Sequence, residues 1–253
     1  SISYDTRTLE PGALFVALSG DKTDGHLYIQ HALDRGAAAV LCERPPEEPG
    51  PWLTVEDTRL ALALVSANWF GRPGDEMTLV AVTGTNGKTT TTNLLKELLE
   101  RVLEVKVGLV GTNRNMIGGR ELPAHRTTPE SYELQSLLRQ MADGGCTYVV
   151  MEVSSHALVQ RRTAGLTFDA GVFTNLTQDH LDYHHTMEEY RDAKGLLFGQ
   201  CRRAVLNLDD EAGRRYLKHV VSLFTTPWRL CPPDCVWGWS WRRWPGRCLG
   251  LRG

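Results

Sequence analysis

A glycine-rich loop between a predicted strand and a predicted helix constrains this chain more than any other feature. The apolar residues 78–82 predict a buried strand, and residues 89–102 predict a helix with Leu94, Leu95, Leu98 and Leu99 on one face. Residues 83–90 between them read TGTNGKTT. Glycines let backbone N–H groups approach a phosphate closely, and a helix N-terminus favours negative charge. A glycine turn that merely caps the helix is the alternative, but the flanking elements favour a phosphate-binding loop.

Single residues of this loop suit the same chemistry. Lys88 can reach the terminal phosphates of a nucleotide as a point charge, and the Thr89 hydroxyl suits Mg²⁺. The spacing departs from the general GxxxxGK[ST] pattern, because Val82 occupies the position of the first glycine. The predicted ATP-binding residues are Gly84, Thr85, Asn86, Gly87, Lys88, Thr89 and Thr90.

Strand and helix patterns alternate after this loop, and shorter ones precede it. The later pattern predicts a mostly parallel, doubly wound α/β sheet, whose ligands bind at the carboxyl ends of its strands. The earlier pattern predicts a small α/β domain, with a break near residues 71–74. The predicted strands are 14–18, 37–41, 52–55, 105–110, 148–153, 168–174 and 204–207, with further helices at 57–70 and 188–198. We therefore expect an N-terminal domain at 1–74, an incomplete central domain at 75–226 and a tail at 227–253.

Composition and charge exclude several classes of protein. Hydrophobic residues make up 42% of the chain, which argues against general disorder, and a net charge of -2 provides no basic field for nucleic acid. No apolar run reaches the ~20 residues of a membrane span, and no signal-peptide pattern opens the chain. The six cysteines lack CxxC spacing, which is typical of reduced thiols. We expect a soluble cytoplasmic protein with no nucleic-acid or membrane partner.

The two ends of the sequence are unusual. The chain begins at Ser1 without a methionine, so we expect a truncated N-terminus. Residues 227–253 hold five of the seven tryptophans, five arginines and one acidic residue, without strand or helix periodicity. A basic aromatic arm for nucleic acid or membrane is one interpretation. The favoured interpretation is translation in a wrong frame, which gives a frameshifted or disordered tail.

Two more predicted strands end in residues with metal-binding or catalytic chemistry. Glu152 closes the strand at 148–153, where its carboxylate can hold Mg²⁺ beside the phosphate loop or only cap the next helix. Residues 179–185, DHLDYHH, follow the strand at 168–174. Of these residues we choose His180 alone as the candidate functional residue. Asp179 suits an N-cap, and His184 and His185 suit solvated loop positions.

The segments around Lys194 and at residues 126–130 have structural interpretations when only their own residues are considered. Lys194 lies in a predicted helix, where a lysine is usually a solvated charge. Residues 126–130 suit a loop followed by a helix start, with Thr128 as the cap and Pro129 in the first turn.

Taken together, these motifs resemble those of one family, the Mur ligases. Residues 83–90, 152–156, 174–176 and 179–182 follow the family's order along the chain. Residues 126–130, the Ser154–Gln160–Arg162 spacing and Lys194 are similar to the tripeptide synthetases of that family. Residues 5–7 and 20–25 resemble the uridine-nucleotide domain of those enzymes. The resemblance extends from residue 1 to about residue 222.

The resemblance implies an ATP-dependent ligase of peptidoglycan synthesis. Such an enzyme joins a diamino acid, meso-diaminopimelate or L-lysine, to the D-glutamate of UDP-N-acetylmuramoyl-L-alanyl-D-glutamate. In the family, ATP phosphorylates the D-glutamate carboxylate, and the amine of the diamino acid attacks the acyl phosphate. The implied partners are therefore the UDP-linked dipeptide and a diamino acid.

The resemblance also assigns roles to single residues. It implies that Lys88, Glu152, His180 and Lys194 are catalytic, with two Mg²⁺ ions. Thr89 and Glu152 serve one ion, and His180 and a carbamylated Lys194 serve the other; the carbamate supplies the ligand oxygen that an ammonium lacks. The implied substrate-binding residues are Tyr4, Thr6, Asp21, Lys22 and Thr23 for the UDP end, and Thr127, Thr128, Ser154, Gln160 and Arg162 for the muramoyl-dipeptide end. Arg126 departs from the family, whose members often have Asn there.

A larger departure concerns the third domain of Mur ligases, which binds the incoming amino acid. This sequence contains no segment that resembles it, so we expect weak or no turnover, and the choice of diamino acid is not readable. Two other functions fit part of the pattern: a ligase like folylpolyglutamate synthetase, which lacks a UDP-type first domain, and a non-catalytic nucleotide-binding module.

Overall fold

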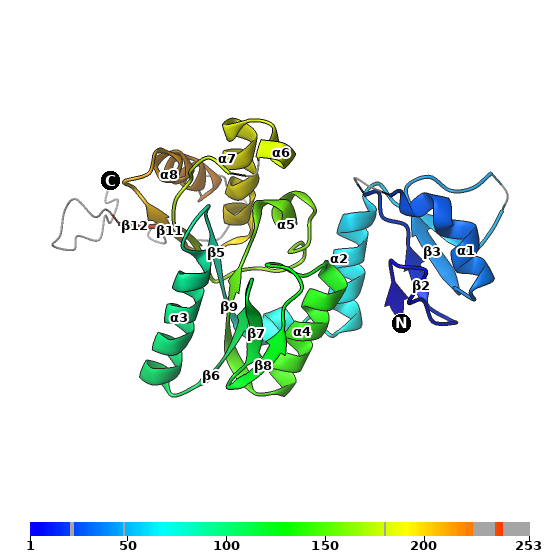
Figure 1. The fold of residues 1–253 in the computed structure, drawn as a ribbon, viewed down its shortest axis with the longest axis horizontal. Coiled ribbons are helices and arrows are strands. Elements are labelled where there is room, and N and C mark those ends of the chain that lie inside the picture. Colours follow the sequence, from blue (N-terminus) through cyan, green and yellow to red (C-terminus); the bar gives the residue numbers. More distant parts are fainter. Residues whose placement is uncertain (21–22, 48, 180, 225–235, 240–253) are drawn as a thin grey trace. The chain divides into compact units, whose positions relative to one another are not determined.

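The computed structural model describes residues 1–20, 23–47, 49–179, 181–224 and 236–239. The chain divides into two compact units, Ser1–Gly71 and Arg72–Gly253, and each is described by itself (Figure 1). Within the described residues, no helix has the length and apolar character needed to cross a bilayer.

The first unit is a small parallel sheet with helices. Its strand order is β1-β2-β3-β4, and every pair is parallel. Phe15 and Val40 are fully or almost fully buried in its core, together with Ala32 from the first helix. The elements are β1 (Ile2–Ser3), β2 (Leu14–Val16), η1 (Gly25–Tyr28), α1 (Ile29–Asp34), β3 (Ala39–Cys42), β4 (Trp52–Thr54) and α2 (Thr58–Trp69).

The second unit is built on an eight-stranded sheet of order β12-β11-β10-β5-β9-β6-β7-β8. The pairs from β12 to β6 are parallel, whereas β6-β7 and β7-β8 are antiparallel. Its strands are β5 (Thr78–Thr83), β6 (Lys106–Val110), β7 (Arg114–Ile117), β8 (Arg120–Pro123), β9 (Cys146–Glu152), β10 (Ala170–Phe173), β11 (Ala204–Asn207) and β12 (Val236–Trp239). Its helices are η2 (Pro73–Glu76), α3 (Lys88–Leu103), α4 (Ser131–Asp143), α5 (Ser155–Val159), α6 (Leu181–His184), α7 (Met187–Gly195), η3 (Leu196–Gln200) and α8 (Glu211–Phe224).

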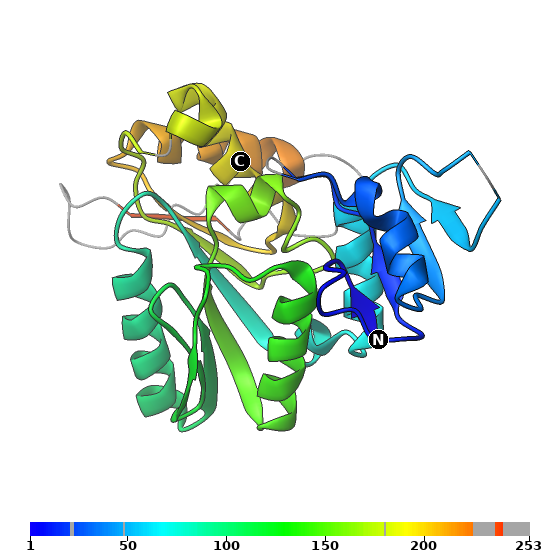
Figure 2. The same ribbon diagram turned by 45° about the vertical axis from the view of Figure 1, so that its right-hand side comes forward.

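Helices cover both faces of the central strands, which explains their continuous apolar sequence. Val82 and Val150 are fully buried on one side, where the partly buried Leu95 and Leu99 of α3 pack against them. Leu79 and Met151 face the other side, against the buried residues of α4. Figure 2 shows α3 and α4 on these two sides of the sheet. The expected doubly wound, mostly parallel α/β fold is confirmed.

Three features differ from the sequence-based expectations. Leu94 and Leu98 are 61% and 56% exposed, because at 100° per residue they lie beside the sheet-facing stripe of α3 rather than in it. The hairpin strands β7 and β8 were not predicted, since their polar residues hide the strand pattern. The helix predicted at 188–198 is α7 followed by the 3-10 helix η3.

Part of the predicted tail has regular backbone structure. Residues 236–239 form β12, which pairs in parallel with β11 from Ala204↔Val236 to Asn207↔Trp239. This differs from the expectation of an irregular tail; valine and tryptophan suit strands, and an unpaired sheet edge accepts another strand. The rest of 227–253 lies outside the described residues.

Replacing Leu138 of α4 tests the packing between helix and sheet. Leu138 has no exposed surface, so Leu138→Ala removes buried methyl groups and leaves a cavity. We expect the free energy of unfolding to fall by about 2–5 kcal/mol in urea denaturation. Leu94→Ala, at an exposed helix position, is the control and should change stability by less than about 0.5 kcal/mol. Equal losses in the two variants would contradict the assignment of the core.

Candidate functional site

The predicted phosphate loop lies at the carboxyl end of β5 and leads into α3. Gly84 has φ 145° and Gly87 has φ 82°, conformations that other residues rarely adopt. A Cβ on Gly84 would also lie 2.0 Å from Thr174 Oγ1. Glycine is therefore required at position 84 for its backbone angle and for space. The loop ends at the start of α3, where the first N–H groups of an α-helix have no partner within the helix itself.

Residues after β10 hold the loop in place. Thr85 N donates to Asn175 O at 2.8 Å, and Asn86 N donates to Asn175 Oδ1 at 3.1 Å. Asn86 O accepts from Thr174 Oγ1 at 2.7 Å. Thr85 and Asn86, two of the predicted ATP-binding residues, thus connect the loop to the end of the neighbouring strand.

Two lysines far apart in the sequence share the carbonyl oxygen of Gly84. Lys88 Nζ lies 3.0 Å from this oxygen and 2.9 Å from Thr85 O, and Lys194 Nζ lies 2.8 Å from it. Burial lowers the pKa of Lys88, although the charges of Glu152 and Asp179 oppose this shift. The pKa of Lys194 falls to about 7, because burial and the neighbouring Lys88 charge disfavour its ammonium form.

Lys194 is not the solvated helix charge that its sequence context suggested. Its side chain is 1% exposed, and Nζ lies 4.4 Å from the ring centroid of Tyr190, one helical turn earlier. The Tyr190 hydroxyl in turn lies 3.3 Å from Thr85 Oγ1. Among the described residues, no carboxylate forms an ion pair with Lys194. Helix α7 therefore delivers a buried amine to the phosphate loop.

His184 also differs from the expectation of a solvated loop residue. Its side chain is buried, and Nε2 lies 2.8 Å from Ser155 Oγ. Its ring centroid lies 5.0 Å from that of Tyr190. Apolar packing on Tyr190 and the contact with Ser155 account for the burial. His185 has φ 57° and an exposed side chain.

Glu152, at the end of β9, brings a buried carboxylate to the same site. Thr89 Oγ1 donates to Oε2 at 3.1 Å, and Thr112 donates through Oγ1 to Oε2 at 2.9 Å and through N to Oε1 at 3.0 Å. The carboxylate is 1% exposed and, within the described part of the chain, makes no ion pair. Oxygen ligands of this kind fit Mg²⁺. The described residues contain no cluster of three or more His, Cys, Asp or Glu side chains that suits a metal ion.

The residues expected at the muramoyl-dipeptide end lie beside Glu152. Thr128 Oγ1 donates to Glu152 O at 2.9 Å and accepts from Ser154 N at 3.1 Å. Thr127 Oγ1 lies 3.0 Å from Thr112 Oγ1. Thr128 does not cap α4, contrary to expectation; Glu130 is the N-cap position, since the Thr128 hydroxyl is committed to the strand end.

Arg162 and Gln160 extend this group. Arg162 Nη1 donates to Thr128 O at 2.9 Å, and Nη2 donates to Gln160 Oε1 at 2.6 Å. Arg162 Nε lies 2.9 Å from Glu130 Oε1, which also accepts Arg126 Nη1 at 2.6 Å. We call Thr127, Thr128, Ser154, Gln160 and Arg162 the cradle.

The residues expected at the UDP end belong to the first unit. Thr6 is buried and Tyr4 partly buried, while Thr23 is exposed and its carbonyl accepts from Gly20 N at 3.2 Å. Asp21 and Lys22, like His180 of the second unit, lie outside the described residues.

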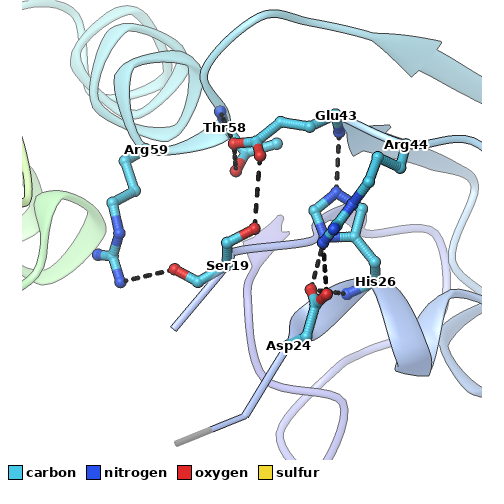
Figure 3. Close-up of polar contacts among 7 residues, drawn as sticks. All are labelled: Ser19, Asp24, His26, Glu43, Arg44, Thr58 and Arg59. Atoms are coloured by element: carbon cyan, nitrogen blue, oxygen red, sulfur yellow. Dashed lines mark hydrogen bonds and ion pairs between the residues drawn. The ribbon is translucent and has the colours of Figure 1, made fainter. Parts of the chain in front are cut away.

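The first unit also contains a polar network that the sequence did not predict, and Asp24, the neighbour of Thr23, belongs to it (Figure 3). His26 Nδ1 lies 2.7 Å from Asp24 Oδ1, and His26 Nε2 accepts Glu43 N at 2.9 Å. Because Nε2 accepts, the proton is on Nδ1 and is donated to Asp24. The Glu43 carboxylate accepts Thr58 N at 2.9 Å, Thr58 Oγ1 at 2.8 Å and Ser19 Oγ at 3.4 Å.

Two arginines complete this network. Arg44 pairs with Asp24, and Arg59 Nη2 donates to Ser19 O at 3.2 Å. Burial raises the pKa of Glu43, but the hydrogen bonds from Thr58 and Ser19, together with the nearby His26, outweigh burial, so its pKa lies below the usual value. The network joins the end of β3 and the start of α2 to the segment around Ser19 and Asp24.

Sequence reasoning missed several residues of these sites. Tyr190 was detectable, because it lies four residues before Lys194 and thus on the same helix face. Thr112 was detectable as a residue just after β6, at the carboxyl edge of the sheet. No sequence pattern marked Glu43 or His26 as part of a network, because Glu43 contacts residues that are distant in sequence.

Comparisons with known proteins agree with this geometry. A family model described as the Mur ligase middle domain matches residues 82–225. The chain belongs to the Mur ligase family. A second model, described as the Mur ligase family catalytic domain, matches residues 1–69.

Three similar proteins, two known by sequence and one by its solved structure, are ligases of the same name. A UDP-N-acetylmuramoyl-L-alanyl-D-glutamate–2,6-diaminopimelate ligase of Clostridium botulinum is 46% identical over 86% of this chain and 46% of its own length. A ligase of the same name from Geobacillus kaustophilus is 48% identical over 88% of this chain and 47% of its own length. A solved structure of a ligase of that name is 31% identical with a TM-score of 0.81, and the match covers 94% of this chain and 48% of that one. The chain spans about half the length of the relatives it matches.

The Glu43 network gives a prediction for stability. Thr58→Val keeps the shape of a side chain that has no exposed surface but removes one donor to the Glu43 carboxylate. We expect a loss of about 1.5–3 kcal/mol, measured by native-state hydrogen exchange of the β2 and β3 amides. Thr54→Val, at an exposed strand position, is the control.

The loss of stability caused by Thr58→Val should depend on pH. The pKa of Glu43 is lowered, so its contribution to stability is complete above the unfolded pKa and is lost as the pH falls through the folded pKa. The difference between wild type and Thr58→Val should therefore narrow at acidic pH. A constant difference would contradict the role of the Glu43 charge.

Proposed function

We propose that this chain carries the ATP site and the UDP-dipeptide site of a ligase that adds a diamino acid to UDP-N-acetylmuramoyl-L-alanyl-D-glutamate. The observation that carries the proposal is the meeting of Lys88, Lys194 and Glu152 at one phosphate loop. The family match supports it, as do relatives whose names include that substrate and 2,6-diaminopimelate. 2,6-Diaminopimelate is accordingly the favoured diamino acid, with L-lysine as the alternative.

The proposed reaction has two steps. A carboxylate oxygen of D-glutamate attacks the γ-phosphorus of ATP, which gives an acyl phosphate and releases ADP. The amine of the diamino acid then attacks the acyl carbon, loses a proton and expels phosphate as the amide forms. Phosphoryl transfer needs positioning and charge neutralisation more than covalent help from the protein. We also propose a cytoplasmic location for this reaction.

Residues of the loop would bind ATP. The N-terminus of α3 and residues 84–90 would hold the phosphates, and Lys88 would leave the Gly84 carbonyl to reach the terminal ones. Thr89 and Glu152 would hold one Mg²⁺, with His180 and Lys194 at a second. When bound, Mg²⁺ neutralises phosphate charge. The cradle would hold the muramoyl-dipeptide end, and Tyr4, Thr6, Asp21, Lys22 and Thr23 the UDP end.

Lys194 would act as a carbamate. Its Nζ, buried and with a pKa of about 7, would attack CO₂ and release one proton, which gives an N-carboxylate. Such a group offers oxygen atoms beside the phosphate loop where the ammonium offers none. In the carbamate form, Lys194 would give up its present hydrogen bond to Gly84 O.

Binding measurements test the proposed function and do not depend on turnover. We expect the chain to bind Mg·ATP and UDP-N-acetylmuramoyl-L-alanyl-D-glutamate in isothermal titration calorimetry. Lys88→Ala should weaken Mg·ATP binding at least about tenfold, because a charged contact to phosphate is lost. Lys106→Ala, at the amino end of β6, is the control and should bind normally. Binding of ATP without the UDP-dipeptide would instead favour a nucleotide-binding module of another kind.

The carbamate has a direct spectroscopic test. With ¹³C-bicarbonate, wild type should show one carbamate signal in ¹³C NMR, and Lys194→Ala should lack it. Lys96→Ala is a matched control, since Lys96 is also buried but pairs with Glu100 at 2.6 Å. A signal that survives in Lys194→Ala would overturn the carbamate. In a version with turnover, formate should partly restore the activity that Lys194→Ala removes.

A further inference from the structure

The Glu152 carboxylate is held mainly by one residue at the end of another strand, Thr112. Thr112 follows β6 and contacts both carboxylate oxygens: its N donates to Oε1 at 3.0 Å, and its Oγ1 donates to Oε2 at 2.9 Å. Paired donors fix the orientation of a carboxylate as well as its position. Thr89 adds one donor, from Oγ1 to Oε2 at 3.1 Å. Within the described residues, Thr112 therefore supplies two of the three donors to this carboxylate.

These contacts leave room for a cation on Glu152. An ionised carboxylate has about four acceptor sites, so three donors do not exhaust it. Thr89 is itself a proposed Mg²⁺ ligand, and its hydroxyl oxygen would turn from Glu152 toward the ion. Thr112 has no such competing role. Its two donors can therefore hold the carboxylate in one orientation whether or not a cation is bound.

The hydroxyl proton of Thr112 has two acceptors within reach. Glu152 Oε2 lies at 2.9 Å and Thr127 Oγ1 at 3.0 Å, but a hydroxyl has a single proton. A hydrogen bond to an ionised acceptor is stronger than one to a neutral oxygen, so the proton is directed to Glu152. Thr127 contacts the same hydroxyl oxygen and restrains the Thr112 side chain.

The backbone beside Thr112 also makes room for the carboxylate. A Cβ at Gly111 would lie 2.7 Å from Glu152 Oε1, so the carboxylate occupies space that a side chain there would need. Gly111 N donates to Asn115 Oδ1 at 3.3 Å, and Asn115 Nδ2 donates to Pro123 O at 3.1 Å. The hairpin of β7 and β8 thus restrains the segment from which Thr112 donates.

We propose that Thr112 is a positioning residue that orients Glu152 to bind Mg²⁺ at the phosphate loop. This inference rests on the proposed function, in which Thr89 and Glu152 share one ion. It goes beyond that function by assigning a residue that acts only through another side chain. The N–H and hydroxyl of Thr112 hold the carboxylate in place before the cation arrives, so that cation binding does not have to order it.

Manganese binding tests this assignment in the full chain. Mn²⁺ suits the same oxygen ligands as Mg²⁺, and electron paramagnetic resonance measures its free concentration. Mn²⁺ is titrated into the complex with ADP, with the chain in excess so that no free ADP competes for the metal. We expect Thr112→Val to bind Mn²⁺ at least about tenfold more weakly, the usual scale for losing a partner that orients a metal ligand.

Matched variants separate the hydroxyl from the rest of the residue. Thr112→Ser keeps both donors and should bind Mn²⁺ as wild type does. Thr112→Ala removes the hydroxyl in a second way and should behave like Thr112→Val. Thr147→Val, at an exposed position of the same strand as Glu152, is the control and should not weaken binding. Unchanged melting temperatures would show that the variants fold.

Combination with Glu152→Gln shows whether Thr112 acts through that carboxylate. Glu152→Gln removes the charge that holds the ion and should weaken Mn²⁺ binding at least as much as Thr112→Val. The double variant should bind Mn²⁺ no more weakly than Glu152→Gln alone, because a positioning residue has no effect once its ligand is lost. In EDTA, Thr112→Val should bind ADP as wild type does.

The outcomes separate this inference from the proposed function. Unchanged Mn²⁺ binding in Thr112→Val would overturn the role of Thr112 and leave the proposed function standing. An equal loss in Thr112→Ser, or additive losses in the double variant, would also contradict the assignment. Weaker ADP binding in EDTA would show that Thr112 supports the nucleotide loop instead of the metal ligand. If wild type with ADP bound no Mn²⁺, both this inference and the proposed metal site would be wrong.

Discussion

The carbonyl oxygen of Gly84 is the point on which the site depends. It accepts a hydrogen bond from Lys88 at the start of α3 and one from Lys194 of α7, which lies 110 residues after Gly84 in the chain. Burial disfavours the ammonium form of Lys194, and the neighbouring Lys88 charge adds to this effect, so the pKa of Lys194 falls to about 7 although the Asp179 charge opposes the shift. The same oxygen therefore holds Lys88 at the start of α3 and brings a buried amine with a lowered pKa next to it.

The parallel sheet explains why distant residues meet there. The loops after β5, β9 and β10 all lie at the carboxyl edge, so Lys88, Glu152 and Asn175 come together although they are far apart in sequence. Buried polar groups at this edge satisfy each other: Thr89 and Thr112 donate to Glu152, and Thr128 closes the strand end. The cradle and the phosphate loop are therefore parts of one hydrogen-bonded assembly.

Sequence patterns predicted the features that depend on neighbouring residues. The glycine-rich loop between β5 and α3, the strand that ends at Glu152 and the alternation of strands and helices were all readable, because each follows from local spacing. The patterns gave the wrong role for Thr128 and the wrong environment for His184. In both cases a contact with a distant segment, the end of β9 for Thr128 and Ser155 for His184, competes with the local preference.

Local periodicity and residue type fix the order of the elements and the chemistry at each strand end, so both follow from the amino-acid sequence. Which side chains act together depends instead on how the elements pack. Lys194 looks like any helix lysine until α7 packs against the loop, and Arg126 and Arg162 look alike until one is buried in three contacts and the other stays half exposed. Burial, shared partners and long-range hydrogen bonds depend on the packing of segments that are far apart in the chain, and no local pattern encodes that packing.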